Sequence, residues 1–443
     1  MLNKSLYLFI AQLSGYATRM MLPIFLVRTL TKAEYGSYSQ FFLVEALIDT
    51  FFQMGSNQAL YYFVPRDEKN AGAYFLNSLL LNIVLFTIGN SLIGVFRHTA
   101  ADIMGMPVIV DLYWQLFGYT MILMMGTSAE CYLISRNYVK QGAIFIFLRH
   151  FIVSIITLWA AYKFRRVDMI ISALVAARTL SVIGVLIYIH FKMNGFRAEK
   201  YFTKFWDQFK YGAMLGMGGI MWAFLMRLHQ VAVTKTYDIE TFAVYSVGLR
   251  QIPVLQYYSQ SVSSVVMSEV ARFEKSGEWD KIRDLWNRVL ERMYGIGIPI
   301  TVFFLLLSKP LVVTLFTSEY AEAVPIFRIN TIGMLYLVLN PTIILRAMNR
   351  NDITLKVQGG FLVLAPLLLY GGYRLGGMVG IIAAHAVLLL GVRVACHAVL
   401  NRIVKTRLPY FVSLPRMIAF YKHSFRKAWQ MGVSRIAIIR GRA

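Results

Sequence analysis

Apolar residues run through this chain in long blocks that recur with a regular length. Each block holds about 20 residues, the length that an α-helix needs to cross the hydrocarbon core of a bilayer. Polar and charged residues gather in the short stretches between the blocks. The expected fold class is therefore all-α, a polytopic membrane protein. The pattern predicts about twelve transmembrane helices, at residues 6–28, 36–63, 74–96, 112–135, 141–162, 167–191, 209–233, 241–267, 289–309, 325–346, 353–373 and 378–401.

Composition agrees with this interpretation. Of the 443 residues, 58% are hydrophobic and only 15% are charged, and the mean hydropathy is +0.57. These values exclude an ordinary soluble domain. The net charge of +23 does not indicate nucleic-acid binding, because the basic residues lie mainly in short loops and in a tail. Cys131 and Cys396 lie far apart in apolar segments, so we expect them to pack in the core rather than form a disulfide or a metal site.

The first apolar run, Leu6–Val27, is too long for a signal peptide and lacks a small-x-small cleavage site, so it is expected to be the first helix. The basic residues then set the orientation. The N-terminus, alternate loops and the tail hold 29 Lys and Arg, and the opposite loops hold 10. Because cytoplasmic loops are enriched in Lys and Arg, both termini are expected to face the cytoplasm.

Two basic segments are amphipathic. Apolar residues share one helical face within Trp279–Arg292, and an apolar stripe in the tail contains Ile418, Tyr421, Phe425 and Trp429. Basic amphipathic helices lie on anionic headgroups, so these segments predict contact with anionic membrane lipids.

Six arginines fall inside the predicted spans, more than one helical turn from either end: Arg19, Arg149, Arg178, Arg227, Arg250 and Arg393. A guanidinium at the bilayer centre costs ~2.5–3.5 kcal/mol on insertion scales, and arginine cannot lose its proton to avoid that cost. Only three acidic residues, Glu45, Asp49 and Glu130, lie equally deep in the same spans. The surplus of positive charge indicates an interior suited to a negatively charged ligand.

Small residues and prolines accompany three of these arginines on predicted helix faces, which is typical of a cavity wall. Arg19 shares a face with Gly15 and Pro23, Arg227 with Gly216 and Ala223, and Arg250 with Ser246, Pro253 and Tyr257. Substrate contact and a structural salt bridge to Glu45 or Asp49 both stay open. Arg149 and Arg178 either line the cavity or pair with Glu130 and backbone carbonyls, whereas Arg393 is expected to extend toward the cytoplasmic headgroups.

Glu45, Asp49 and Gln53 follow one another at intervals of four residues and form one acidic stripe on the second predicted helix. Paired carboxylates in a membrane cavity can hold a proton or Na⁺ and exchange it for substrate. They can equally neutralise nearby arginines. The isolated histidines, His229, His385 and His397, are expected to be packed side chains rather than ligands.

An internal repeat relates the two halves of the chain. At an offset of 207, Glu34–Ser39 aligns with Thr241–Ser246, and Arg28 aligns with Lys235. Repeats of this kind are typical of transporters whose substrate lies between them. Arg28 and Lys235 mark the outer ends of helices one and seven and are candidates for an outer gate. The predicted domains are a six-helix lobe at 1–200, a second six-helix lobe at 201–402 and a basic amphipathic cytoplasmic tail at 403–443.

Several segments resemble one known family. They are GYATRMMLPIFLVR at 15–28, LTKAEYGSYSQ at 30–40, MGSNQALYYFVP at 54–65, TFAVYSVGLRQIP at 241–253, the basic stretch at 265–292, and LVVTLFTSEYAEAVPIFRI at 311–329. The chain resembles Wzx-type oligosaccharide flippases, in the polysaccharide-transporter branch of the MOP (MATE-like) superfamily. One departure concerns the seventh helix, where relatives often carry an acidic residue near the position of Met226–His229.

The resemblance implies a MATE-like pair of pseudo-symmetric lobes that rock about a central cationic cavity. It implies a transporter, not an enzyme, that flips undecaprenyl-pyrophosphate-linked oligosaccharides across the bacterial inner membrane for assembly of O-antigen, capsule or exopolysaccharide. The candidates for pyrophosphate contact are Arg19, Arg227 and Arg250, with Arg149 and Arg178 as further candidates, since a guanidinium pairs bidentately with phosphate oxygens.

No organic cofactor or metal is expected, and the coupling ion is left open between H⁺ and Na⁺. A polysaccharide polymerase and chain-length proteins are candidate partners. Gly212-x-x-x-Gly216 lacks the Lys-Ser/Thr of a phosphate-binding loop, and its small residues suit helix packing. Two alternatives stay open. The first is an ion-coupled exporter of another small amphiphile. The second is a membrane glycan polymerase or glycosyltransferase, against which the short outer loops at 97–111 and 310–324 argue.

Overall fold

The computed structural model describes residues 2–193, 202, 204–413 and 415–422, and within this part of the chain regular structure is entirely helical. The chain packs as two compact units. Unit 1 comprises Met1–Val247 and Val312–Glu322, and unit 2 comprises Gly248–Leu311 and Ala323–Ala443. The fold class predicted from the sequence is confirmed.

Unit 1 holds the first eleven α-helices and two short 3₁₀ helices. Their bounds are α1 Leu2–Thr29, α2 Lys32–Phe52, α3 Ser56–Phe63, η1 Val64–Arg66, η2 Glu68–Asn70, α4 Ala71–Val95, α5 Arg97–Met104, α6 Val108–Asp111, α7 Tyr113–Ser135, α8 Val139–Phe164, α9 Val167–Met193, α10 Phe205–Thr236 and α11 Ile239–Gly248. The C-terminal part of α14 (Ser308–Phe316) and η3 (Ser318–Tyr320) also belong to this unit.

Unit 2 is built from the remaining helices and from the first residues of α14. Their bounds are α12 Pro253–Lys275, α13 Trp279–Leu306, α15 Ala323–Gly333, η4 Met334–Leu337, α16 Thr342–Ala347 and α17 Asn351–Ile403. The non-helical dihedral angles of Gly376 and Gly377 divide α17 into the two spans that hydropathy predicts there.

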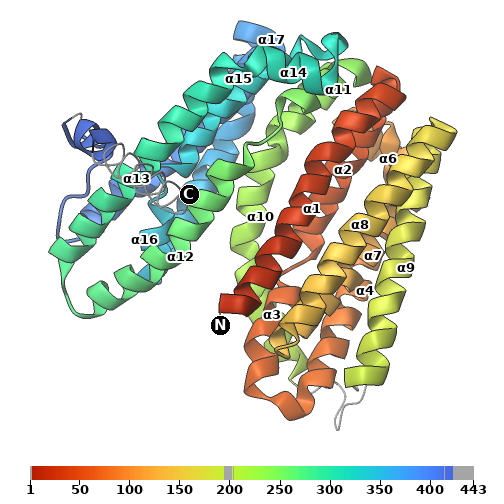
Figure 1. The fold of residues 1–443 in the computed structure, drawn as a ribbon, viewed down its shortest axis with the longest axis horizontal. Coiled ribbons are helices and arrows are strands. Elements are labelled where there is room, and N and C mark those ends of the chain that lie inside the picture. The colour runs from red at the N-terminus through yellow and green to blue at the C-terminus, as the bar shows by residue number, and fades with distance from the viewer. Residues whose placement is uncertain (1, 194–201, 203, 414, 423–443) are drawn as a thin grey trace, which may run out of the picture. The chain divides into compact units, whose positions relative to one another are not determined.

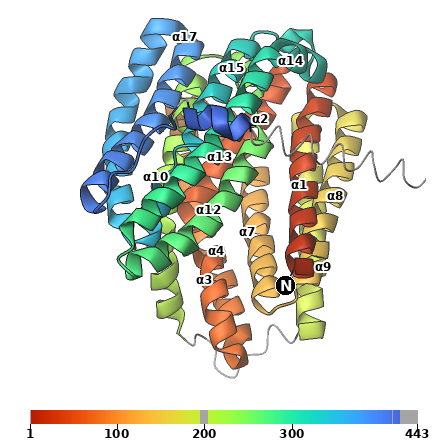
Figure 2. The same cartoon turned by 60° about the vertical axis from the view of Figure 1, so that its left-hand side comes forward.

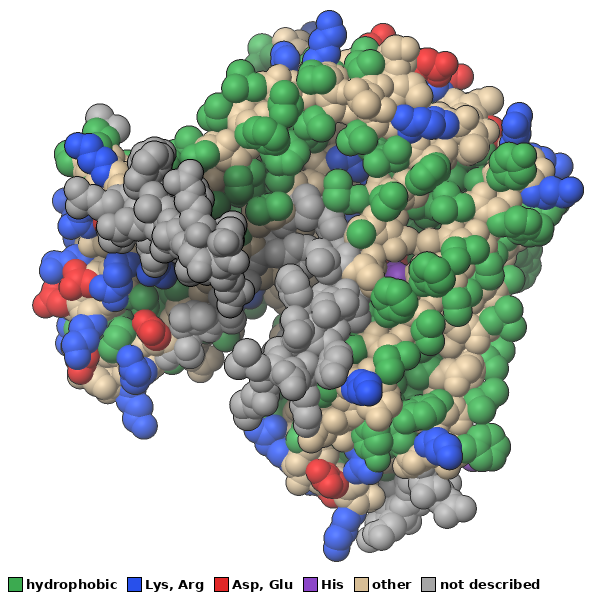
Figure 3. Space-filling view, viewed as in Figure 1, with side chains coloured by type: hydrophobic (Ala, Val, Ile, Leu, Met, Phe, Trp, Pro, Cys, Tyr) green, Lys and Arg blue, Asp and Glu red, His purple; other side chains and the backbone are tan. Residues whose placement is uncertain are grey.

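Each predicted span coincides with one or more helices, which is consistent with twelve crossings. Within the described residues, seven helices or helix pairs are long and apolar enough to cross a membrane by length and composition. The 53-residue α17 is one of them and holds two predicted spans. In Figure 3, hydrophobic side chains cover much of the face over α8 and α9, and basic side chains gather toward the ends of the helices. Phe151 and Trp159 of α8 are more than half exposed on the isolated chain, as expected of side chains that face lipid.

Close helix packing forms the core of unit 1. α1 lies along α8, and α8 in turn lies beside α9 (Figures 1 and 2). A side chain at Gly15 would overlap the ring of His150, so this glycine sets how closely α1 and α8 approach. The predicted small-residue packing of Gly212 and Gly216 is also found, because both glycines contact the backbone of Met54 and Gly55.

Three of the predicted spans are broken rather than continuous. The span at 36–63 is interrupted between α2 and α3, where Met54 and Gly55 have positive φ. The span at 241–267 is interrupted between α11 and α12, ahead of Pro253. Proline disfavours helical angles in the preceding residue, and Ile252 is extended there. The span at 325–346 changes from α15 through η4 to α16.

The apolar face of Trp279–Arg292 does not form a separate helix on the membrane surface. This segment is the first half of α13, and its apolar residues Ile282, Leu285, Trp286 and Val289 are buried inside unit 2. The Trp286 Nε1 atom donates to the Pro409 carbonyl at 2.9 Å. The prediction of lipid contact was wrong for this face, because a hydrophobic stripe indicates burial but not whether lipid or protein buries it.

The tail is described only as far as residue 422, where residues 415–422 are helical. Phe420 packs against Gly295 of α13, and Arg416 pairs with Glu291 at 3.6 Å. Phe425 and Trp429 of the predicted stripe lie outside the described residues.

The repeat at offset 207 is visible in the way two helices begin. Thr31 caps α2 by accepting a hydrogen bond from the Glu34 backbone N–H at 3.2 Å. The matched Asp238 accepts one from the backbone N–H of Thr241, at the start of α11, at 2.7 Å. Matched positions therefore use the same N-cap chemistry.

The side chains of Ser39 and Ser246, which are also 207 residues apart, hydrogen-bond to each other at 3.0 Å. Two equivalent positions can touch in this way only close to a pseudo-two-fold axis that relates the repeats. The compact units do not coincide with the predicted lobes at 1–200 and 201–402, because α10 packs with α2, α3 and α5, and α11 contacts α2. The predicted boundary at residue 200 separates two lobes that are expected to move against each other during transport. That boundary stays a prediction.

Candidate functional site

A cluster of charged side chains lies inside unit 1, within the membrane-spanning helices. Glu45 and Asp49 stand one turn apart on α2, and the charges of Arg178 and Arg227 act on both carboxylates. Arg178 comes from α9 and Arg227 from α10, so three helices contribute to the cluster. Sequence spacing predicts the α2 stripe, and the fold brings the arginines to it.

Neither Glu45 nor Asp49 forms an ion pair with a described arginine. The buried Oδ1 atom of Asp49 also has no hydrogen-bond partner among the described residues. Arg227 uses one guanidinium nitrogen on the Ala223 carbonyl of its own helix, at 3.3 Å. The carboxylates and arginines are thus close enough to interact electrostatically while keeping hydrogen-bonding capacity for a ligand or an ion.

Tyr119 of α7 is a member of this cluster that the sequence did not indicate. Its hydroxyl accepts a hydrogen bond from Arg178, whose guanidinium also lies 4.8 Å from the centre of the tyrosine ring. Glu45 and Arg149 act electrostatically on the same hydroxyl. A tyrosine within an apolar span looks like ordinary packing, so only the fold identifies it as a positioning residue for Arg178.

Arg149 of α8 forms an ion pair with Glu130 of α7, and both side chains are largely buried. Pairing with Glu130 was one of the two alternatives for Arg149. Contact of Arg149 with substrate stays a prediction. For Arg178 the observed partner is a tyrosine rather than Glu130.

The described charges that lie deep in the predicted spans of unit 1 balance. Arg149, Arg178 and Arg227 stand against the three acidic residues of the spans, Glu45, Asp49 and Glu130. The excess of positive charge that the sequence indicates therefore comes from three other arginines. Arg19 is on α1, but its side chain lies outside the described residues, and Arg250 and Arg393 belong to unit 2.

Arg250 lies on the non-helical connection between α11 and α12 rather than on a helix face. The predicted face shared with Ser246, Pro253 and Tyr257 was wrong, because the chain is not helical from residue 249 to 252. The side-chain amide of Asn330 donates to the backbone carbonyls of Gly248 and Arg250, each at 3.4 Å. Broken helices with exposed carbonyls are where transporters often bind ions and substrates.

Arg393 does not extend toward the headgroups, as was predicted. It is 6% exposed and donates to the Asn340 side chain at 2.8 Å and to the Thr342 hydroxyl at 3.0 Å. These partners lie at the break before α16. The position near the helix end permitted an outward orientation, but buried acceptors satisfy the guanidinium internally.

The two candidate gate residues make matching contacts. Arg28 donates to the carbonyls of Thr314 at 2.7 Å and Leu315 at 2.5 Å, in the last turn of α14. Lys235 donates to the Asp102 carbonyl at 2.5 Å, in the last turn of α5. Each basic side chain thus neutralises a helix C-terminus contributed by the other repeat.

A network of buried amides and hydroxyls adjoins the break between α2 and α3, and the sequence interpretation missed it. Asn57 Oδ1 accepts from Ser128 Oγ at 2.6 Å and from Asn82 Nδ2 at 3.1 Å, and Ser56 Oγ donates to Asn82 Oδ1 at 2.6 Å. Asparagines within apolar spans were the available signal. The histidines behave as expected of packed side chains, and His229 bonds the Tyr245 hydroxyl at 2.6 Å.

Solved structures with this fold are membrane transporters. The lipid II flippase MurJ, in an inward closed conformation, matches 98% of this chain and 93% of its own at a TM-score of 0.71 and 13% identity. An inward-facing multidrug resistance MATE family transporter of the MOP superfamily matches 92% of this chain and 96% of its own at a TM-score of 0.66 and 12% identity.

A MOP superfamily transporter from Pyrococcus furiosus, described as having a binding pocket of reverse polarity, matches 90% of this chain and 95% of its own, with a TM-score of 0.59 and 12% identity. At these identities the likeness shows the fold alone, which this chain shares with MurJ and MATE transporters. Residues 25–325 match the family model described as polysaccharide biosynthesis protein, and the chain belongs to that family. No curated protein sequence matches it.

Proposed function

We propose that this chain is a flippase that carries a lipid-linked oligosaccharide from the cytoplasmic to the outer leaflet of a bacterial inner membrane by alternating access. The substrate class is an undecaprenyl-pyrophosphate-linked unit for O-antigen, capsule or exopolysaccharide assembly. Membership of the polysaccharide biosynthesis family and the MOP fold support transport of such a unit. The observation that carries the proposal is the membrane-embedded cluster of Arg178 and Arg227 opposite Glu45 and Asp49.

The cluster suits a diphosphate because each guanidinium offers paired donors for phosphate oxygens. Arg19 and Arg250 stay candidates for phosphate contact from the sequence alone, and Arg149 stays paired with Glu130 until substrate competes for it. The lipid chain remains in the bilayer. A proton or Na⁺ gradient drives the cycle, because the sequence carries no nucleotide-binding loop.

Exchange at the cluster couples ion and substrate. Arg178 and Arg227 carry the diphosphate outward, and after it leaves, Glu45 and Asp49 take up H⁺ or Na⁺ from the outer side. The ion moves inward down its gradient as the carrier returns and is released to the cytoplasm, so inward movement of the ion resets the site for the next substrate. Arg28 and Lys235 hold the outer ends of the repeats together as an outer gate until release.

The test uses purified protein in liposomes loaded with a fluorescent lipid-pyrophosphate oligosaccharide, with and without a proton or sodium gradient. Arg227→Ala, Arg19→Ala and Arg250→Ala are compared with the wild type, and Arg374→Ala serves as an exposed control. Gradient-dependent transfer that is lost in the three variants and kept in the control is the expected result.

Transfer that is unchanged in all three variants would overturn the arginine site. Transfer of amphiphilic cations, with none of the lipid-linked glycan, would identify an ion-coupled exporter. Polymerisation of the glycan without transfer would identify an enzyme.

A further inference from the structure

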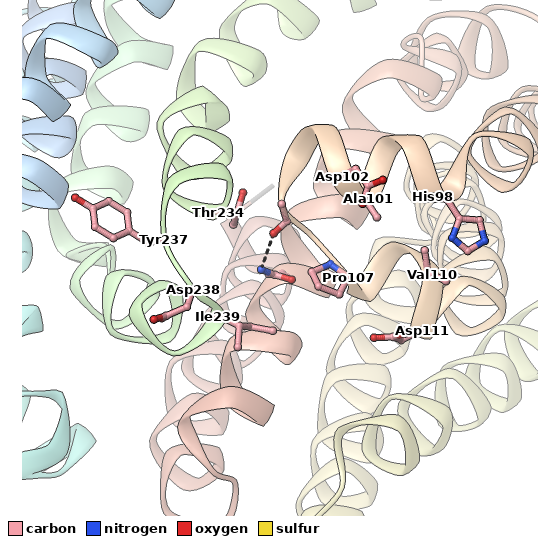
Figure 4. A pocket seen from close by; sticks show the side chains of 12 residues that line it. His98, Ala101, Asp102, Pro107, Val110, Asp111, Thr234, Tyr237, Asp238 and Ile239 are labelled. Atoms are coloured by element: carbon pink, nitrogen blue, oxygen red, sulfur yellow. Dashed lines mark hydrogen bonds between the residues drawn. The ribbon is translucent and has the colours of Figure 1, made fainter.

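A pocket of about 580 Å³ lies within unit 1, apart from the charged cluster. Residues of α5 and α6, the connection from α10 to α11, and Gln40 of α2 form its walls (Figure 4). It opens at the ends of the helices where the loop at 97–111 lies, which the distribution of basic residues places on the outer side. The sequence showed nothing unusual in this loop, yet the loop forms one wall of the pocket.

Three carboxylates line this pocket, together with the ring of His98 and the hydroxyls of Thr234 and Tyr237. Asp102, Asp111 and Asp238 line it, and no Lys or Arg is among its described lining residues. Figure 4 shows that these carboxylates come from different segments around the space. The backbone N–H of Thr241 holds the pKa of Asp238 below its usual range, so this carboxyl is ionised at neutral pH.

Gln40 adds a further acceptor. This side chain is 2% exposed, and its amide nitrogen donates to the Gly105 carbonyl at 3.3 Å, the bond drawn dashed in Figure 4. Its Oε1 atom has no hydrogen-bond partner among the described residues. A buried acceptor left without a donor is unfavourable, and a ligand that brings a donor would remove that penalty.

The fold uses the carboxylate of Asp238, which caps α11, but it does not require those of Asp102 and Asp111. Lys235 contacts Asp102 only through the backbone carbonyl of Asp102. Thr314 is the equivalent of Asp102 in the other repeat, because its carbonyl accepts a hydrogen bond from Arg28. The local offset between the two is 212 residues (314 minus 102). The same offset relates Gly105 to Thr317, and both have positive φ. It relates Asp111 to Ala323, so the second repeat forms the equivalent turn without either acid.

The chemistry of the pocket excludes several ligands. Among the described residues, no three acidic, histidine or cysteine side chains lie close enough together to hold a metal ion. A phosphate group would meet three carboxylates and no Lys or Arg among the described lining residues. The volume falls in the range of about 300–1,000 Å³ that small-molecule sites occupy. What fits is an uncharged or amino-bearing ligand with many hydroxyl donors, which is a sugar.

We propose that this pocket binds sugar residues of the glycan on the outer side of the membrane, through donation from sugar hydroxyls or amines to Asp102, Asp111 and Gln40. The inference rests on the proposed flippase function and assigns that function a second subsite, distinct from the arginines that take the diphosphate. A glycan held here after crossing is kept from returning with its lipid, which favours release outward.

The experiment measures binding of three lipid-free probes, maltotriose, triacetylchitotriose and the glucosamine trimer, to the full-length protein in detergent by saturation-transfer NMR. The test protein carries Asp102→Asn with Asp111→Asn, both at exposed positions that leave the helices intact. The control is Asp168→Asn, an exposed aspartate that pairs with Arg166 away from the pocket.

At least one probe is expected to bind the wild type and the control, and to bind the double variant about tenfold or more weakly, because hydrogen bonds to two charged acceptors are weakened. No binding of any probe, or equal binding by the double variant, overturns the proposal. Transfer of the lipid-linked glycan is measured on the same wild-type preparation. Transfer without sugar binding refutes the subsite alone, and sugar binding without transfer refutes the flippase alone.

Discussion

Arg149 and Arg393 both lie buried in apolar helices, yet different chemistry satisfies them. Arg149 has a carboxylate partner in Glu130, whereas Arg393 donates to an asparagine and a threonine beside a helix break. The sequence predicts that each guanidinium needs a partner, because hydrocarbon offers none. It cannot predict which partner, because Glu130 and Asn340 reach these arginines only through the packing of different helices.

We expect Glu130→Gln to destabilise the protein by ~3–5 kcal/mol, because it leaves Arg149 buried without its counter-charge. The double change Glu130→Leu with Arg149→Leu is expected to restore most of that stability, since apolar side chains replace a desolvated pair. Thermal unfolding in detergent measures both effects. A double variant that is stable but does not transfer substrate would show that Arg149 also contacts the substrate, and an unchanged melting temperature in Glu130→Gln would refute the ion pair.

Substitutions of Glu45 and Asp49 test the coupling between ion and substrate. Glu45→Gln and Asp49→Asn keep the shape of each side chain but remove the charge that must be gained and lost in every cycle. We expect gradient-dependent transfer to be lost in both variants, with lipid-linked substrate still bound. Glu34→Gln is a control for carboxylate loss on the same helix, because Glu34 belongs to the capping box. Loss of folded protein in the Glu45 and Asp49 variants would instead favour a purely structural role.

At the scale of the helix, hydropathy predicted where spans lie but not where they break. The break before Pro253 had a local signal in the proline, and the turn at Gly376 and Gly377 had one in the paired glycines. The break after α2 depends on contacts from α10, where Gly212 and Gly216 pack against the backbone of residues 54 and 55. Nothing local in sequence reveals such a contact.

We expect Gly55→Ala to destabilise unit 1. Gly55 has a φ of +63°, which costs an L-residue about 1 kcal/mol or more, and its added carbon would overlap the Gly212 carbonyl oxygen. Gly219→Ala on α10 is the matched control, because nothing lies within 4 Å of the added methyl group. Unfolding in detergent should show a lower melting temperature for Gly55→Ala alone. Equal stability of the two variants would contradict the packing of α10 on the break.

For the molecule as a whole, the offset of 207 that aligned two short segments corresponds to real contacts. It pairs Thr31 with Asp238 as N-caps, and it pairs Arg28 with Lys235 as donors to a helix end in the opposite repeat. A repeat in sequence predicts that two halves fold alike. It does not predict how tightly α10 and α11 pack with the first half, which depends on the conformation that the chain adopts.

The contact between Ser39 and Ser246 gives the sharpest test of alternating access, because it joins the two repeats at their pseudo-two-fold axis. If the lobes at 1–200 and 201–402 separate on the outer side to release substrate, this contact must open. The two hydroxyl oxygens are 3.0 Å apart, so cysteines at both positions need only a small shift to reach the ~2.0 Å of a disulfide. The native Cys131 and Cys396 are both buried and should compete little.

We expect Ser39→Cys with Ser246→Cys to cross-link on oxidation, to stop transfer in liposomes, and to regain transfer when a reductant is added. Each single cysteine variant should transfer normally under both conditions. Cross-linked protein that still transfers the lipid-linked glycan at the wild-type rate would show that the repeats do not part at the axis. The proposed outer gate of Arg28 and Lys235 would then have to open by local movement of α5 and α14, with α2 and α11 remaining together.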